Sequence, residues 1–158
     1  MACEFSANAV QTVNPGESVV FTNNPVPCTR GFVNHRDETG NFLLSGWMPN
    51  NMRCRCCNRN RSATYLVEFG ANIAVPTGGT VEAISLAIAL DGTTIPSSQR
   101  IVTPAAVEEY GNVACTVTAQ VFNACGCQTL TVRNISDQPI LVQNANVVIS
   151  RPDLAVTR

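Results

Sequence analysis

Lysine is absent from this chain of 158 residues, and charged residues of any kind are scarce. They make up 13% of the sequence, about half the usual share, and the formal net charge is −1. This balance excludes the broad basic face that recruits nucleic acid. With so few charges, solubility depends on Asn, Thr, Ser and Gln. Such a composition suits a protein whose surface is largely covered by partners, or one that belongs to an extracellular particle.

Long apolar runs and hydrolase motifs are also missing. The longest apolar runs, such as AISLAIAL, are too short to cross a bilayer, so no membrane association is expected. The first residues, MACEFSANAV, lack the basic and apolar regions of a secretory signal peptide, and we expect synthesis without one. There is no G-x-S-x-G sequence, and His35 is the single histidine. Because a catalytic triad needs converging groups, we predict a protein that is not an enzyme and carries no cofactor.

What the sequence does contain is a succession of short strand-like segments separated by Pro, Gly and Asn. Residues 111–121 alternate strictly, with Val113, Cys115 and Val117 on one face, which is the pattern of a half-buried strand. Asp91-Gly92 stands between two apolar runs and predicts a tight hairpin. Only residues 103–111, TPAAVEEYG, could hold a helical turn. The sequence therefore predicts an all-β sandwich or barrel of about eight to ten antiparallel strands.

One domain covering residues 1–158 accounts for this length, with a Cys- and Arg-rich insertion loop at about 49–62. The segments FLLSGW and ISLAIALDG are apolar on both faces. One face packs inward in a sandwich, and a neighbouring subunit is the simplest cover for the other. We therefore expect an oligomer.

The order of three segments resembles the C1q/TNF-like trimeric jelly roll. They are ATYLVEFGANIAVPTGG, ISLAIALDGTTIPSSQR and CGCQTLTVRNISDQPILVQNANVVISR, within a match that runs from about Ala9 to Pro152. TLTVRNISDQPI is the most similar stretch, and bacterial and phage members, such as collagen-like spore-surface proteins and phage particle proteins, are the most similar. The resemblance implies a jelly-roll head domain and a homotrimer. No Gly-X-Y stem precedes it, and the insertion loop is not a feature of the family.

Eight cysteines raise three alternatives: a zinc site, disulfides or free thiols. Zinc favours ligand pairs spaced C-x₂-C, and the C-x-C and C-C spacings here do not match. The ligands to test for zinc are Cys54, Cys56, Cys125 and Cys127. Disulfides between the insertion loop and the ACGC turn, within a chain or between chains, fit better, and the candidates are Cys54, Cys56, Cys57, Cys125 and Cys127. Cys3, Cys28 and Cys115 stand alone in the sequence, and Cys115 is expected in the core.

The insertion loop is also a candidate contact surface. Guanidinium groups suit carboxylates and phosphates, but no aromatic residue lies between these arginines to stack on bases. A solvated loop or a docking contact to an acidic neighbour remain the alternatives. Trp47 either caps the core or anchors a subunit contact. The candidate interface residues are Trp47, Met48, Arg53, Arg55, Arg59 and Arg61. Asn60 and Asn134 begin sequences that match the glycosylation pattern.

These observations predict a non-enzymatic structural protein, a trimeric jelly roll on the surface of a bacteriophage virion, as capsid decoration, head fibre or tail-associated protein. Its expected partners are its own copies and other particle proteins, and its expected location is the virion or an extracellular surface. Two alternatives stay open. The same trimer could be a binding module for a host surface glycan or protein, or a structural protein of a spore or cell surface.

Overall fold

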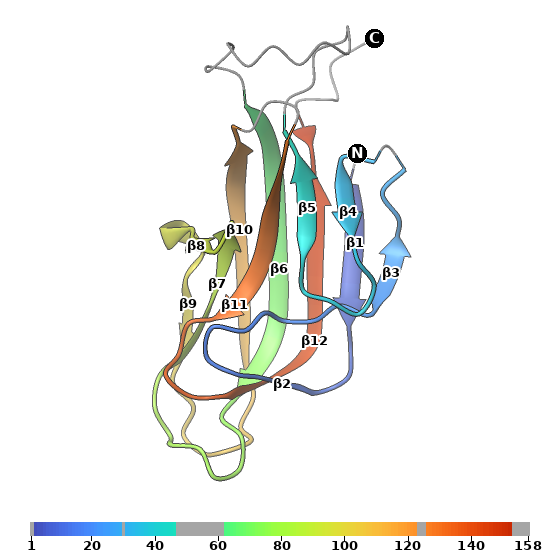
Figure 1. Cartoon of the computed structure of the whole chain (residues 1–158). Helices are drawn as coiled ribbons and strands as arrows, with labels where there is room; N and C mark the ends of the chain where they lie inside the picture. Colours follow the sequence, from blue (N-terminus) through green and yellow to red (C-terminus); the bar gives the residue numbers. More distant parts are fainter. Residues whose placement is uncertain (1, 30, 47–61, 123–125, 153–158) are drawn as a thin grey trace, which may run out of the picture.

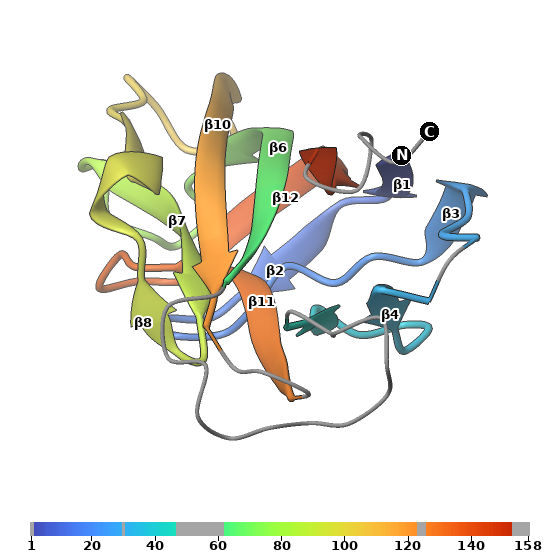
Figure 2. The same ribbon diagram turned by 90° about the horizontal axis from the view of Figure 1, so that it is seen from above.

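The structure, a computed structural model, describes residues 2–29, 31–46, 62–122 and 126–152. They form two antiparallel sheets that stack face to face, as the views along and across the strands show (Figures 1 and 2). Among these described residues, the helical element is a short 3₁₀ turn, η1 (Pro96–Ser98). No helix in the described ranges is long and apolar enough to cross a membrane.

Sheet A has five strands side by side, with a sixth short strand at one end. In spatial order the five are β10 (Gly111–Val121), β6 (Ala63–Ala74), β12 (Ile140–Ser150), β1 (Ala2–Ala7) and β3 (Asn23–Val26). The sixth, β2 (Gln11–Val13), pairs with the start of β12. The first and last strands of the described chain therefore lie together in the middle of this sheet.

Sheet B has the same antiparallel construction. In spatial order its strands are β4 (Val33–His35), β5 (Phe42–Ser45), β11 (Cys127–Asn134), β7 (Ile84–Leu90) and β8 (Thr93–Thr94), and β9 (Arg100–Val102) also pairs with β7. Four of the twelve strands, β2, β4, β8 and β9, have only two or three residues. The eight longer strands account for the two-sheet sandwich predicted from the sequence.

Local sequence signals predicted several elements correctly. Val113, Cys115 and Val117 all face the core on β10. Asp91 and Gly92 connect β7 to β8 with positive φ angles of 49° and 80°, as a tight hairpin turn requires. Residues 103–111, where the sequence allowed a helical turn, contain none. That segment is irregular and then enters β10, and the helical turn found among the described residues lies at η1, where Pro96 occupies the first position.

Aromatic side chains from both sheets meet between them. Phe5 of β1 and Phe42 of β5 have ring centroids 4.9 Å apart, and Phe21 packs against Phe42 at 5.3 Å. Tyr65 of β6 is fully buried, and its hydroxyl donates across the sandwich to Ser45 O at 2.6 Å and Phe32 O at 3.1 Å. This phenol therefore ties sheet A to the strand pair at the edge of sheet B.

The second face of β7 is covered by the chain itself. Ala87 and Ala89 are buried, with 2% and 0% of their surface exposed. Arg133 is paired with Ala87 and Thr94 with Ala89, so larger side chains on the neighbouring strands flank these methyl groups. The expectation that a neighbouring subunit covers this face was therefore wrong for β7. Leu43, in the FLLSGW segment, does stay 42% exposed.

Candidate functional site

Most of the residues predicted to form sites lie outside the described residues. This applies to Trp47, Met48, Cys54, Cys56, Cys57, Cys125, Arg53, Arg55, Arg59 and Arg61. Their assignments to zinc, disulfides or an interface therefore stay predictions. Cys127 is described and carries an exposed thiol at the start of β11. Within the described ranges, no three His, Cys, Asp or Glu side chains come close enough together to hold a metal ion.

The strand ends that flank the two cysteine-containing segments lie next to one another. Cys127 is paired with Ser45, and Gly46 N donates to Gly126 O at 2.8 Å. On the other sheet, Val121 is paired with Ala63. The ends of β5, β6, β10 and β11 thus share one end of the sandwich. A disulfide between the insertion loop and the ACGC turn requires that the strand ends flanking them lie close together, and this arrangement meets that requirement.

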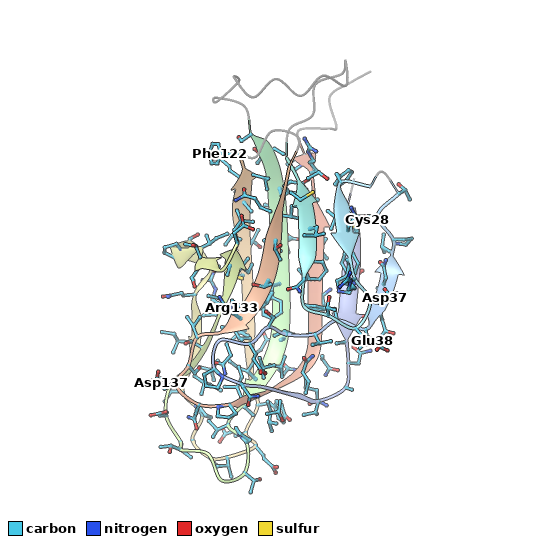
Figure 3. All side chains as sticks on the ribbon, viewed as in Figure 1. Cys28, Asp37, Glu38, Phe122, Arg133 and Asp137 are labelled. Atoms are coloured by element: carbon cyan, nitrogen blue, oxygen red, sulfur yellow. A yellow bond between two sulfur atoms is a disulfide. The ribbon has the colours of Figure 1, made fainter. Side chains whose placement is uncertain are left out.

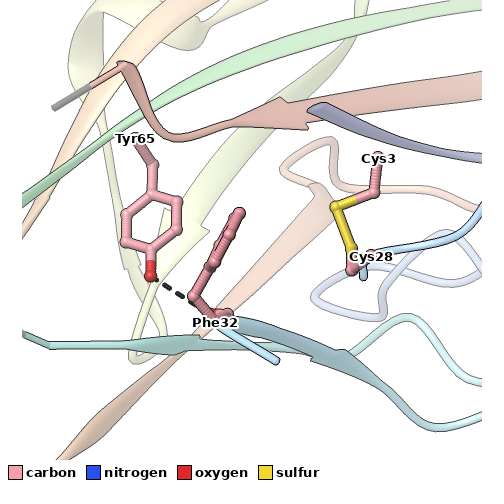
Figure 4. The surroundings of a disulfide bond; sticks show 4 residues. All are labelled: Cys3, Cys28, Phe32 and Tyr65. Atoms are coloured by element: carbon pink, nitrogen blue, oxygen red, sulfur yellow. Dashed lines mark hydrogen bonds between the residues drawn. A yellow bond between two sulfur atoms is a disulfide. The ribbon is translucent and has the colours of Figure 1, made fainter. Parts of the chain in front are cut away.

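A disulfide that the sequence did not predict joins Cys3 of β1 to Cys28, just after β3 (Figure 4). Their Cα atoms are 5.0 Å apart, and Cys3 is fully buried. Sequence reasoning treated both cysteines as isolated because β1 was not recognised as a strand. The alternation of Cys3, Phe5 and Ala7 as buried residues was the available signal, since it places Cys3 on the core face.

Next to this disulfide, an arginine is buried in an aromatic cluster. Arg151, which follows β12, is only 6% exposed, and its guanidinium carbon lies 5.5 Å from the centroid of the Tyr65 ring and 6.0 Å from that of Phe32. Cation–π contacts of this geometry strengthen when water is excluded. The cluster lies at the end of the core next to the strand ends that flank the insertion loop. Its packing therefore supports those strand ends.

Three polar or titratable residues singled out from the sequence have structural roles. His35 Nε2 lies 3.0 Å from Thr39 O, and its ring stacks on Phe42 at 4.6 Å, so it supports the β4–β5 turn. Asn134 is fully buried, and its Nδ2 donates to Val13 O and Gln138 O, both at 2.9 Å. A buried amide with these partners cannot accept a glycan. Cys115 is a core residue, as predicted, and burial raises the pKa of its thiol.

The outward face of sheet A has features of a subunit contact. Its central strands present mostly small or uncharged side chains, and the charged groups on or beside it are Glu4, Glu68 and Arg100 of β9. These two glutamates flank Val148 in one row across β1, β12 and β6. Asn146 Nδ2 donates to Glu4 Oε1 at 2.7 Å. Depletion of charge is the compositional mark of interface centres.

A hollow of about 550 Å³ lies in the middle of this face. It forms where Gly70 has no side chain and Ala114, its neighbour on β10, has only a methyl group. Glu68, Arg100, Thr116, Asn146 and Val148 surround it, and Arg100 Nε donates to Ala114 O at 2.8 Å. At the usual strand spacing and rise, the whole face measures about 700 Å². One partner in a stable protein interface buries about 600 to 1,000 Å², so the area of the face falls within that range.

The two most exposed large apolar side chains lie along the β10 side of the molecule rather than on this face. Ile101 of β9 is 66% exposed and Phe122, just after β10, is 61% exposed; Figure 3 shows Phe122 at the end of that strand. Tyr110, just before β10, is 38% exposed. The hollow face and this apolar edge are two different surfaces of one chain. A ring of copies needs two such surfaces that fit each other.

Comparison with known proteins identifies the fold. No family model matches this chain, and no curated protein does. Among solved structures, murine APRIL matches with a TM-score of 0.55 and 7% identity over 96% of this chain and 99% of its own. The globular domain of zebrafish complement 1qA matches with a TM-score of 0.51 and 10% identity over 94% and 92%. The chain thus has a C1q/TNF-like jelly-roll fold, as the sequence predicted, and at these identities the likeness concerns the fold alone.

Proposed function

We propose that this C1q/TNF-like chain is a non-enzymatic structural protein that assembles as a homotrimer on the outer surface of a particle, a bacteriophage virion in the first instance. The observation that carries the proposal is that the chain presents two different surfaces, the hollow face of sheet A and the apolar edge beside β10 with Ile101, Tyr110 and Phe122. C1q/TNF-like domains usually trimerise. In a closed trimer each copy would place its β10 edge against the hollow face of the next.

The disulfide supports an extracellular location for the assembled protein. Cys3 and Cys28 are bonded, and disulfides persist in oxidising surroundings such as particle and cell surfaces. The low charge of 13% agrees with a chain whose surface is partly covered by its own copies and by other particle proteins. Phage particle proteins are among the proteins that TLTVRNISDQPI and its neighbouring segments resemble, together with collagen-like spore-surface proteins.

The trimer is tested by light scattering on the full chain, with a charge placed in the hollow. Ala114 is exposed at the hollow, so Ala114→Arg puts a long cation where the neighbouring edge would lie. Thr93→Arg, on the exposed β7–β8 hairpin of the opposite sheet, is the matched control. We expect three times the chain mass for the wild type and for Thr93→Arg, and a smaller mass for Ala114→Arg. A monomeric wild type would refute the trimer.

Location on a particle needs its own test. An antibody against the recombinant chain, applied to particles purified from a lysate of the producing host, should label their outer surface in electron micrographs. Label on intact particles supports a surface position. Label that is found only after particles are disrupted, or only on host cells, would refute it.

A further inference from the structure

The outer face of sheet B carries a groove that no part of the proposed assembly uses. Two hollows of about 520 and 440 Å³ form it, and they share Asn41 and Thr129. Its floor follows the register of the sheet, because Leu43 of β5 is paired with Asn34 of β4 on one side and with Thr129 of β11 on the other. From β4 to β7 the groove spans three strand spacings, roughly 14 Å.

One wall of the groove is fixed by hydrogen bonds within the chain. Arg133 donates from Nε and Nη2 to Gly16 O, at 3.0 and 2.7 Å, and from Nη1 to Gly92 O at 3.1 Å. Asp91 accepts from Thr129 N at 2.8 Å and from Gln128 Nε2 at 2.9 Å. Because these charged groups are already engaged, they shape the wall and leave recognition to other side chains.

The opposite side presents polar groups that are open to a ligand. Asn34, Arg36 and Asn41 line the groove and are exposed, and their side chains make no hydrogen bond to the described residues. The two amides each offer a donor and an acceptor in one plane, and the guanidinium offers several donors. Groups of this kind can bond to neighbouring hydroxyls of one ligand at the same time.

The backbone that carries these open groups is held in place before any ligand binds. The turn from β4 to β5 is closed by Thr39, whose N and Oγ1 both donate to Arg36 O, at 3.2 and 2.7 Å. His35 stacks on Phe42 and contacts Thr39 O, and Phe21 N donates to the same carbonyl at 3.1 Å. A preorganised site loses less conformational entropy on binding.

The side chains on the floor and rim of the groove indicate which class of ligand it could bind. Leu43 is the large apolar side chain on it and is 42% exposed, which is enough to contact the C–H face of a sugar ring but too little for an amphipathic helix. Arg36 is followed by Asp37 and Glu38, which are exposed beside it (Figure 3). Arg36, Arg133 and Asp91 line the groove, and with Asp37 and Glu38 beside it two positive groups stand against three negative ones. The groove and its rim therefore have no excess of positive charge to attract phosphate, nucleic acid or acidic sugars.

We propose that this groove binds a neutral oligosaccharide, with Asn34, Arg36 and Asn41 bonding its hydroxyl groups and Leu43 contacting one sugar ring. The inference goes beyond the structural role proposed above, because a single copy carries the whole groove and no residue from a neighbour completes it. A short chain of sugars matches a groove of roughly 14 Å. With few apolar contacts, one site is expected to bind weakly, and several copies on one particle would strengthen binding to a surface that repeats the same sugar.

The proposal is tested by applying the labelled full chain to an array of neutral and acidic glycans, followed by calorimetric titration of the strongest neutral one. Asn34→Ala and Asn41→Ala remove the two open amides. Asn8→Ala, an exposed asparagine between β1 and β2, is the matched control. We expect about a tenfold loss of affinity for each groove variant, the size of one or two lost hydrogen bonds, and no loss for Asn8→Ala.

Three results would overturn the inference: no glycan bound, acidic glycans alone bound, or neutral glycans bound equally by both groove variants. Thermal unfolding of each variant shows whether a loss of binding reflects a loss of fold, and two separate groove variants guard against one failing to fold. Failure of the trimer is a distinct outcome. A monomer that binds neutral glycans through Asn34 and Asn41 refutes the assembly and supports the groove.

Discussion

Removal of the Cys3–Cys28 disulfide should strongly destabilise this fold. The bond joins β1, in the middle of sheet A, to the segment after the edge strand β3. Its sequence separation is 25 residues, and the chain-entropy relation for a loop of that length gives about 3.5 kcal/mol. Since domains of this size are stable by roughly 5 to 15 kcal/mol, the loss would be a large part of the total.

The assay is urea unfolding of the double variant Cys3→Ala/Cys28→Ala beside the wild type, at one protein concentration because an assembled protein is stabilised by mass action. With a urea slope of about 1 to 3 kcal/mol per molar, the midpoint should fall by roughly 1 to 3 M. Cys115→Ala is the matched control, because it also removes a buried sulfur but leaves the disulfide intact. Reductant should lower the midpoint of Cys115→Ala as it does that of the wild type.

The bond itself can be checked on one peptide. The first arginine or lysine of the chain is Arg30, so trypsin releases residues 1–30 with both Cys3 and Cys28 inside. Without reductant this peptide should be lighter by two hydrogen atoms than after reduction. An unchanged mass would show that the two cysteines are not bonded to each other. An unchanged urea midpoint in the double variant, with the bond present in the wild type, would refute the entropic reasoning.

Three further predictions concern single side chains. Tyr65→Phe removes the hydroxyl that links the two sheets and should cost about 1 to 3 kcal/mol in urea unfolding, since Ser45 O loses this donor while Phe32 O still accepts from Ser45 N. Asn134→Ala should cost about as much or more, because Ser136 N also loses its acceptor, and intact mass should find no glycan at Asn134 in any host. Hydrogen bonds from Thr129 N and Gln128 hold the pKa of Asp91 below its ordinary value, so the stability they add is present above that value and is lost as pH falls through the lowered pKa. Acid unfolding of Asp91→Asn should therefore show a smaller loss of stability over this range than the wild type, and an equal loss would contradict the assignment.

Sequence patterns predicted those parts of the fold that depend on local alternation and turn chemistry. The β7–β8 hairpin follows from Asp91-Gly92, because few other residue pairs accept two positive φ angles. β10 follows from its strict period of two. β1 was missed because six residues at the start of a chain, ACEFSA, mix small, polar and aromatic side chains without a strong β-branched signal. Its role depends on pairing with β12, more than a hundred residues away.

Contacts between distant segments account for the other differences. Cys3 and Cys28 come together only because β1 and β3 are neighbours in sheet A, and spacing alone does not determine connectivity. Ala87 and Ala89 looked like an apolar face in need of a partner. Their side chains are so small that paired residues on β11 and β8 suffice to bury them. The groove on sheet B gave no sequence signal, since Asn34, Asn41 and Thr129 become neighbours only through the register of three strands.

The two proposed surfaces lie on opposite faces of the sandwich, and this arrangement bears on how they could work together. The two sheets lie on opposite sides of one chain (Figure 2), so a trimer built through the hollow face of sheet A and the apolar edge beside β10 would leave the outer face of sheet B free. Assembly and sugar binding would then not compete for the same residues. Three weak sites facing outward also bind a repetitive surface far more tightly than one, because each bound site raises the effective concentration of the next. A charge at Ala114 should therefore lower binding to a dense glycan surface while leaving the affinity of one groove for a soluble oligosaccharide unchanged. Equal loss in both measurements would mean that the two faces are not independent.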